Sequence, residues 1–161
     1  MARTSFSLFV FLLPIFAHGQ NLIPKNIHPM GNPNKCVDVQ GDVRANGTPV
    51  QVFDCNGSEA QKWFVDPDGT HENVILSGGS FCLDAGSTPG NFVPMKIWQC
   101  FNTLPQQTWI RTDDGRIALV NQGLCLDVPN GNLENGQVLQ TFKCTDNDQN
   151  QFFTFTNTTD F

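Results

Sequence analysis

The sequence predicts an all-β domain built from one unit of about 45 residues that occurs three times. Two observations carry this prediction. The 161 residues include 14 glycines and 10 prolines that recur between short apolar segments, which is typical of strands joined by turns. In addition, a segment that opens with Cys-x-Asp and closes with aromatic-x-Cys occurs at Cys36–Cys55, Cys82–Cys100 and Cys125–Cys144.

The N-terminal segment is expected to be a secretory signal. It contains the cation Arg3, an apolar run of about eleven residues from Phe6 to Phe16, and a small-x-small ending at Gly19. This run is too short to span a membrane, which takes about 20 residues, and a buried N-terminal helix is the alternative. We therefore expect a signal peptide over residues 1–19, one domain over residues 20–161, and a secreted, extracellular protein without membrane insertion.

The three units are expected to cover about residues 26–70, 71–115 and 116–161. Each contains a Gln-x-aromatic motif after its second cysteine, which ends in Trp63, Trp109 or Phe153. Because the motifs recur at steps of 46 and 44 residues, as the cysteines nearly do, the whole unit is repeated and not the cysteines alone.

The six cysteines are expected to form one disulfide inside each unit. Six cysteines allow fifteen pairings, but the repeat selects the one that treats the units alike. It joins Cys36 to Cys55, Cys82 to Cys100 and Cys125 to Cys144, at separations of 19, 18 and 19. No pair has the short Cys-x-x-Cys spacing of a metal site, so we expect no metal and no cofactor.

A strand is predicted before the second cysteine of each unit, because residues there alternate with period two. One face carries the core candidates Val50, Val52, Met95, Ile97, Leu139 and Thr141. The other face carries an aromatic ring at the same place in every unit, at Phe53, Trp98 and Phe142. A large ring that is repeatedly directed outward indicates a role beyond burial.

In order, Cys-x-Asp, aromatic-x-Cys and Gln-x-Trp resemble the motifs of the ricin B-chain-type (R-type) lectins, also called family 13 carbohydrate-binding modules. The resemblance covers about residues 26–155 and extends to small secreted fungal members of the family. It implies a β-trefoil of twelve strands, with a six-stranded barrel closed by three hairpins. It also implies that Trp63 and Trp109 belong to the core, where Phe153 leaves the third unit less filled.

The resemblance further implies one sugar site per unit, in which a carboxylate accepts sugar hydroxyls and a ring packs on sugar C–H groups. The third unit matches best, with Asp127, Gln140, Phe142, Asn150 and Gln151. The second unit supplies Asp84, Lys96, Trp98, Gln106 and Gln107. The first unit supplies Asp38, Gln51, Phe53 and Gln61.

Two units depart from the implied pattern. In the first, Ala60 stands where an amide is expected, and in the second Lys96 and Gln106 replace the expected residues. The glutamines of Gln-x-aromatic are interpreted as groups that orient the aspartates more than as direct sugar contacts. In the alternative interpretation, the aspartates only hold turns and the aromatic rings pack under loops.

Three Asn-x-Ser/Thr sequons predict N-glycosylation at Asn46, Asn56 and Asn157. The first two belong to the first unit and are expected on loops that flank its site, where a glycan would crowd Phe53. Together with Ala60, this makes the first unit the weakest of the three predicted sites.

We expect a non-catalytic, metal-independent lectin for galactose- or N-acetylgalactosamine-type glycans, monomeric and with several sugar sites. The sequence has no nucleophile elbow, His-Glu-x-x-His motif or phosphate loop. Its scattered cations and formal net charge of −6 give no basis for binding nucleic acid. The alternatives are a β-trefoil protease inhibitor and a secreted interaction protein with degenerate sugar sites.

Overall fold

The structure, a computed structural model, describes residues 23–65, 74–76 and 78–158. The predicted signal peptide over residues 1–19 lies outside these ranges. The described residues form thirteen strands and five short 3-10 helices, without an α-helix. None of their helices has the length and apolar character needed to cross a membrane.

The three units follow the same order of strands, except that the second contains the additional strand β7 (Val93–Pro94), and short 3-10 helices lie between the strands. The first contains β1 (Lys25–Pro29), β2 (Lys35–Val39), η1 (Gln40–Asp42), β3 (Val50–Asp54), η2 (Glu59–Gln61) and β4 (Trp63–Val65). The second contains β5 (Val74–Leu76), β6 (Phe81–Asp84), β7 (Val93–Pro94), β8 (Lys96–Gln99), η3 (Pro105–Gln107) and β9 (Trp109–Arg111). The third contains β10 (Ile117–Leu119), β11 (Leu124–Asp127), η4 (Pro129–Gly131), β12 (Gln140–Lys143), η5 (Gln149–Gln151) and β13 (Phe153–Asn157).

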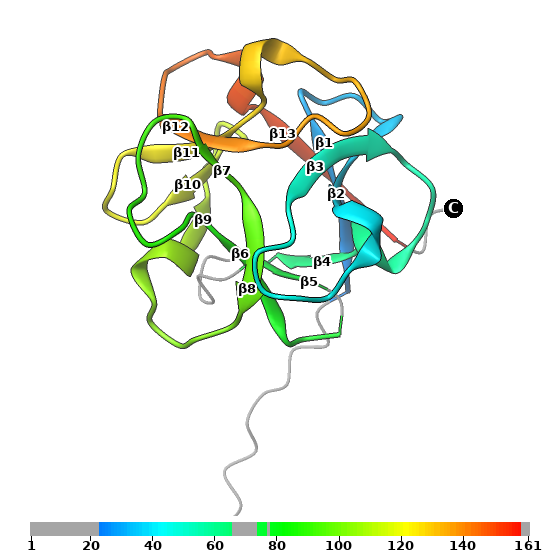
Figure 1. The fold of residues 1–161 in the computed structure, drawn as a ribbon. Helices are drawn as coiled ribbons and strands as arrows, with labels where there is room; N and C mark the ends of the chain where they lie inside the picture. The colour runs from blue at the N-terminus through cyan, green and yellow to red at the C-terminus, as the bar shows by residue number, and fades with distance from the viewer. Residues whose placement is uncertain (1–22, 66–73, 77, 159–161) are drawn as a thin grey trace, which may run out of the picture.

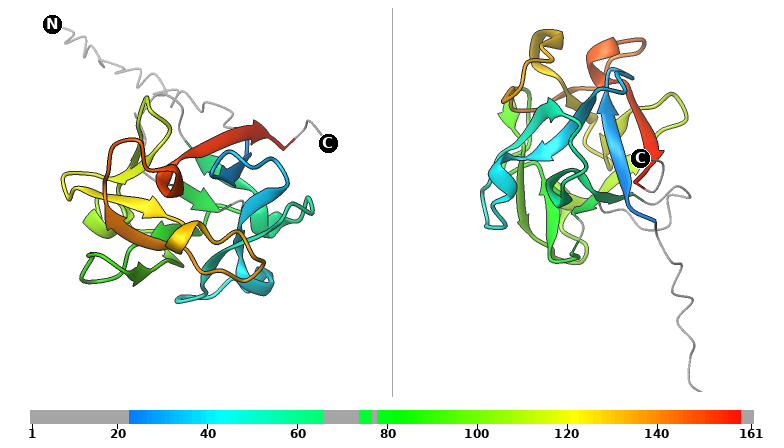
Figure 2. Two further views of the ribbon diagram at one scale, coloured as in Figure 1. Left: turned by 90° about the horizontal axis from the view of Figure 1, so that it is seen from above. Right: turned by 90° about the vertical axis from the view of Figure 1, so that its right-hand side faces the viewer.

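These strands form a β-trefoil, as predicted from the repeats. Each unit contains one antiparallel hairpin, made by β2–β3, β6–β8 or β11–β12. The three units are arranged as three lobes around a common centre (Figure 1). Strand β1 pairs with β13 from Lys25↔Asn157 to Pro29↔Phe153, so the first and last units close on each other, as the right-hand view of Figure 2 shows.

A ring of three backbone hydrogen bonds joins the units. Val50 N–H donates to Met95 O at 3.0 Å, Met95 N–H donates to Leu139 O at 2.8 Å, and Leu139 N–H donates to Val50 O at 2.9 Å. All three side chains are buried in the core, as the alternating pattern predicted. The units are therefore held in register by equivalent residues.

Aromatic residues fill equivalent core positions. Trp63, Trp109 and Phe153 are all buried, as expected. The indole N–H groups of the two tryptophans donate to Val37 O at 2.9 Å and to Leu83 O at 3.0 Å. A phenylalanine has no such donor, so Phe153 lacks this bond.

Two details of the strand arrangement differ from the expectation. There are thirteen described strands and not twelve, because the short segment β7 pairs with β12. Hydrogen bonding also continues from β5 into β6 and from β10 into β11. The described strands therefore form sheets of six, five and two strands, in which the hairpins β6–β8 and β11–β12 continue into neighbouring strands while β2–β3 forms a sheet of its own.

The structure contains the three disulfides that the repeats predict, Cys36–Cys55, Cys82–Cys100 and Cys125–Cys144. Each closes the base of one hairpin, at a separation of 19, 18 or 19 residues. Loops of this size are associated with about 3 kcal/mol of stabilisation each in the chain-entropy model.

Candidate functional site

The hairpin of each unit brings an acid and an aromatic residue to one face. In the third unit Asp127 lies opposite Gln140 across β11 and β12, and Phe142 follows two residues later on the same face. The register is equivalent in the other units, where Asp84 faces Lys96 and Asp38 faces Gln51. Diagonal neighbours in such a ladder lie about 7–8 Å apart, a spacing at which a long side chain or a bound sugar can contact both.

A glutamine from a 3-10 helix holds each aspartate. The Nε2 amide of Gln151, at the end of η5, donates to Asp127 Oδ2 at 3.2 Å. The equivalent bonds are Gln107 to Asp84 Oδ2 at 2.9 Å and Gln61 to Asp38 Oδ2 at 3.0 Å. Each site is thus assembled from a hairpin and from the turn that precedes the last strand of the same unit.

These glutamines use their amide groups within the protein. Gln151 Nε2 also donates to Lys143 O at 2.9 Å, and its Oε1 accepts the Thr145 N–H at 2.9 Å. Gln61 and Gln107 make the same set of contacts in their own units, and all three side chains are fully buried. The contacts fit the orienting role that the sequence suggested, because the amide hydrogens are already donated to protein acceptors.

Burial changes the acidity of two of the aspartates. Desolvation raises the pKa of Asp127 above its ordinary value, although hydrogen bonds from Gln140 and Gln151 oppose the shift. Desolvation likewise raises the pKa of Asp38, against hydrogen bonds from Gln51 and Gln61. A carboxylate offers about four acceptor positions, so each of these acids retains acceptors for ligand hydroxyls.

A hollow of about 430 Å³ lies over the second unit. Its lining includes the predicted residues Asp84, Lys96, Trp98 and Gln106. Phe101 and Leu104, which were not among the predicted residues, also line it. The available signal in the sequence was the position of Phe101 directly after the second cysteine of the unit, and in the structure this residue is 46% exposed.

A second hollow, of about 470 Å³, lies over the first unit. It is lined by Asp38, Gln51 and Phe53 as predicted, and by Ala60, whose side chain adds no hydrogen-bonding group. The Nε2 group of Gln51 donates to Asp38 Oδ1 at 2.9 Å, while its buried Oε1 has no hydrogen-bond partner among the described residues. Among the positions of the motif, the one at Ala60 therefore supplies no polar side chain to this site.

The site of the third unit includes a ring from its neighbour. Gln140 Nε2 donates to Asp127 Oδ1 at 2.7 Å. The ring of Phe92, from the second unit, packs edge-on against Phe142 with 5.0 Å between centroids. Phe92 is 71% exposed and was not among the predicted residues. Asn150, in η5, lies against the η4 turn, where a Cβ on Gly131 would come within 2.9 Å of its Oδ1.

The three sequons lie in different surroundings. The loop that carries Asn46 lines the first-unit hollow through Gly41 and Asp42, as expected, but Asn46 itself contacts the second unit, where its Oδ1 accepts the Gln99 N–H at 2.7 Å. Asn56 lines the first-unit hollow, in agreement with the expectation. Asn157 is in β13, where its Oδ1 accepts a hydrogen bond from Lys25 Nζ at 2.7 Å.

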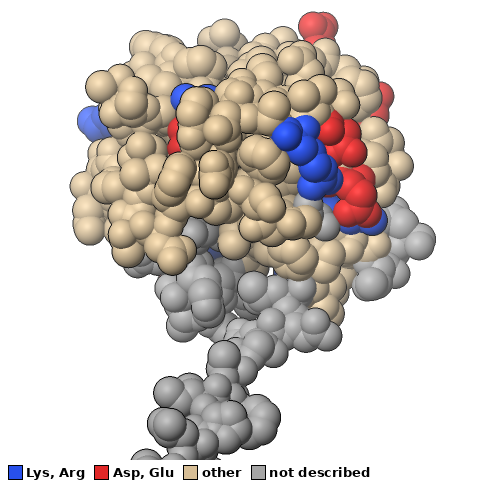
Figure 3. All heavy atoms as spheres, turned by 60° about the horizontal axis from the view of Figure 1, so that its bottom comes forward, with Lys and Arg blue, Asp and Glu red and all other residues tan. Residues whose placement is uncertain are grey.

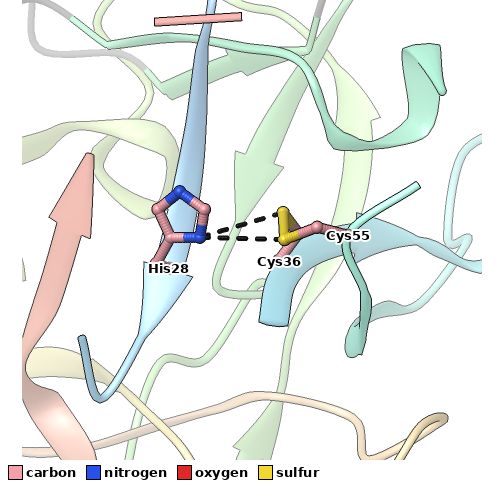
Figure 4. A group of neighbouring side chains, drawn as sticks. All are labelled: His28, Cys36 and Cys55. Atoms are coloured by element: carbon pink, nitrogen blue, oxygen red, sulfur yellow. Dashed lines mark hydrogen bonds between the residues drawn. A yellow bond between two sulfur atoms is a disulfide. The ribbon is translucent and has the colours of Figure 1, made fainter. Parts of the chain in front are cut away.

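The group of His28, Cys36 and Cys55 has the composition of a metal site (Figure 4). The His28 Nδ1 atom lies 3.7 Å from Cys55 Sγ and 4.0 Å from Cys36 Sγ. The two sulfur atoms form a disulfide, so no thiolate is present to bind a metal. His28 also bonds to Lys35 O and Thr156 Oγ1, at 2.9 and 2.7 Å, which indicates a structural role on β1.

The surface charge of the face drawn in Figure 3 is sparse. Most of this face is uncharged, and its largest group of basic side chains lies beside acidic ones. Such mixed charges do not form the continuous basic surface that typically binds nucleic acid.

A threefold β-trefoil with an acid and an aromatic ring on each hairpin is the architecture of the R-type lectins. The chain belongs to this family, because the family model described as "Ricin-type beta-trefoil lectin domain" matches residues 26–153. The domain is thus of a carbohydrate-binding class and is not itself catalytic.

Two curated relatives are much longer than this chain. The "Ribosome-inactivating protein PMRIPt" of Polygonatum multiflorum is 32% identical over 96 residues, which are 58% of this chain and 15% of that protein. The "Ribosome-inactivating protein SNAI'" of Sambucus nigra is 27% identical over 133 residues, 78% of this chain and 21% of that protein. The chain therefore spans about a fifth or less of the length of these relatives.

Solved structures share the fold at low identity. The earthworm R-type lectin C-half in complex with GalNAc superposes with a TM-score of 0.69 at 20% identity, covering 84% of this chain and 98% of that one. An agglutinin from Abrus precatorius also gives a TM-score of 0.69, at 22% identity, covering 83% of this chain and 48% of that one. At these identities the likeness shows the fold alone.

Proposed function

We propose that the protein is a secreted lectin that binds galactose- or N-acetylgalactosamine-type glycans without a metal and without changing them. One observation carries the proposal: each hairpin presents a buried aspartate and an aromatic side chain on one face, and a buried glutamine holds that aspartate. The carboxylate accepts hydroxyl donors while the ring contacts the C–H surface of a pyranose. Three disulfides are consistent with an oxidising compartment and so support secretion.

The proposed contact residues are those implied by the repeated motif. In the third unit they are Asp127, Gln140, Phe142 and Asn150, with Gln151 as the orienting group. In the second they are Asp84, Lys96, Trp98 and Gln106, with Gln107 orienting, and in the first Asp38, Gln51 and Phe53, with Gln61 orienting. Each shallow site is expected to bind a monosaccharide weakly, at about −4 to −6 kcal/mol, and several sites on one molecule would strengthen binding to clustered glycans.

Retention on galactose-agarose, with and without free lactose, tests the proposal. The protein should be retained, and lactose should release it. Asp127→Asn should weaken retention more than Asp38→Asn, because the third unit has the fuller set of polar side chains. Asp114→Asn is a matched control, since this carboxylate lies in an exposed turn where it accepts a hydrogen bond from Thr112. Absence of retention on any galactoside or GalNAc resin would contradict the proposed function.

A further inference from the structure

We propose that the second-unit site selects acidic saccharides, with Lys96 binding a carboxylate or sulfate on the sugar while Trp98 stacks on its ring. This inference rests on the proposed lectin function and concerns one of its three sites. The second-unit site differs from the other two, where the neutral amide of Gln51 or Gln140 occupies the place of Lys96.

Asp84 is more fully occupied by protein donors than its equivalents. Its Oδ1 accepts the Gly86 N–H at 2.7 Å and lies 3.6 Å from Lys96 Nζ, while its Oδ2 accepts from Gln107. In the first and third units one side-chain amide donates to each aspartate oxygen. Asp84 therefore has less remaining capacity to accept a pair of sugar hydroxyls.

In this hollow a ligand can reach the positive charge of Lys96 more readily than the negative charge of Asp84. The Lys96 side chain is 28% exposed, whereas that of Asp84 is 5% exposed. A ligand that enters the hollow meets the ammonium group before it can meet the carboxylate. The ammonium also has three N–H donors, and the ion pair with Asp84 leaves donors for an anionic group.

The ring and the ammonium lie where one sugar can contact both. Lys96 Nζ is 5.7 Å from the centre of the Trp98 ring, and the indole side chain is 36% exposed. Phe101 and Leu104 extend the apolar wall of the same hollow, whose volume of about 430 Å³ lies within the range of small-molecule sites. A pyranose on Trp98 would hold a substituent at its edge toward Lys96.

The chain carries its own reporter for this site. It has three tryptophans, and Trp63 and Trp109 are buried in the core at 0% and 2% exposure. A saccharide that changes tryptophan emission by direct contact therefore acts at Trp98. Tryptophan emission therefore reports binding at the second unit alone, whereas all three units can contribute to retention on a galactose resin.

The experiment titrates the folded protein with methyl β-galactopyranoside, its 6-sulfate and methyl galacturonide while tryptophan emission is recorded. The two acidic probes carry their anions at different groups, a sulfate ester on O6 and a carboxylate at C6, so their separate curves distinguish recognition of the one from recognition of the other. At least one acidic probe should reach half-saturation at about fivefold lower concentration than the neutral galactoside, as expected for an exposed ion pair. The difference should shrink at 0.5 M salt, where the Debye length is about 4 Å.

Lys96→Gln should abolish the acidic preference, so that the acidic and neutral probes give equal half-saturation concentrations, because a neutral glutamine stands at this place in the other units. Lys62→Gln is the matched charge control, since Lys62 pairs with Glu59 outside the second-unit hollow. An acidic preference that persists in Lys96→Gln overturns the inference, as do equal curves for acidic and neutral probes. Retention on galactose-agarose without any emission response overturns it but leaves the proposed function standing.

Discussion

The side-chain oxygen of Asn46, in the first unit, accepts the backbone N–H of Gln99, in the second unit, at 2.7 Å. The same bond occurs twice more around the trefoil: Asn91 Oδ1 accepts the Lys143 N–H at 2.8 Å, and Asn135 Oδ1 accepts the Asp54 N–H at 2.9 Å. Each asparagine thus attaches a loop of one unit to the hairpin of the next. These loops place each candidate site beside residues from two units.

A glycan attached to Asn46 is therefore expected to shield Trp98 and not Phe53. A Cβ added to the neighbouring Gly47 would lie 3.8 Å from the Trp98 ring, which shows how closely this loop approaches the second-unit site. Protein produced in a glycosylating host should show slower acrylamide quenching of tryptophan emission than its Asn46→Asp variant. The expected difference is about twofold or more in the quenching constant, because Trp98 is the exposed indole.

Asn46→Asp suits this comparison because it removes the glycan acceptor and keeps an oxygen to accept the Gln99 N–H. Asn56→Asp is the matched control, since Asn56 lines the first-unit hollow. Loss of the glycan at Asn56 should leave the quenching of tryptophan emission unchanged. Equal quenching of glycosylated protein and Asn46→Asp, with the Asn46 glycan verified by mass spectrometry, would show that the sugar chain points away from Trp98.

Gln151→Leu is expected to destabilise the fold and weaken the third-unit site together. The substitution removes donors to Asp127 Oδ2 and Lys143 O and an acceptor for the Thr145 N–H. Because Asp127 is buried, we expect a loss of about 2–4 kcal/mol in the free energy of unfolding. Urea denaturation measures this loss. The exposed neighbour Gln149, changed to Leu, should cost less than about 0.5 kcal/mol, and a similar loss in both variants would be the contrary result.

Trp63→Phe is expected to cost about 1–3 kcal/mol of stability. The change leaves the buried Val37 carbonyl without the indole donor at 2.9 Å and removes ring volume from the core. Phe153 occupies the equivalent position of the third unit, so a phenylalanine fits the local backbone and the fold should persist. Urea unfolding would measure the cost, with Trp98→Phe as a control whose ring is partly exposed. A Trp63→Phe variant as stable as the parent would mean that the carbonyl finds another donor.

The repeat made much of the fold predictable from the sequence. Three copies of one motif define the disulfide pairs, the core aromatics and the hairpin faces, because equivalent residues in a threefold structure meet equivalent environments. The orienting contacts of Gln61, Gln107 and Gln151 follow from the same repetition. Periodicity within one unit thus carries most of the local geometry.

The cysteine, aspartate and tryptophan motifs do not themselves predict the contacts between units. Asn46, Asn91 and Asn135 recur at steps of 45 and 44 residues, which is the period of the repeat, so their spacing is the sequence signal for these contacts. The position of Asn46 beside the second unit, and of Phe92 beside Phe142, depends on how loops cross between lobes. The strand pattern does not encode that path, since loop residues obey no hydrophobic period.

Sugar binding at the first and third units is expected to be lost on acidification at a pH above 3.8, the ordinary pKa of an aspartate. Burial raises the pKa of Asp38 and Asp127, and a protonated carboxyl accepts hydroxyl donors less well.

The folded state holds the protons of Asp38 and Asp127 more tightly than the unfolded chain does. As the pH falls through the raised pKa values, their protonation therefore does not destabilise the fold. Asp54 and Asp114 behave oppositely: hydrogen bonds from Lys35 and Thr112, respectively, lower their pKa, so their contribution to stability is lost only below 3.8. Retention on a galactose resin should consequently fall before near-ultraviolet circular dichroism reports unfolding, and coincident loss of both signals would contradict the assignment of the raised pKa to the sugar sites.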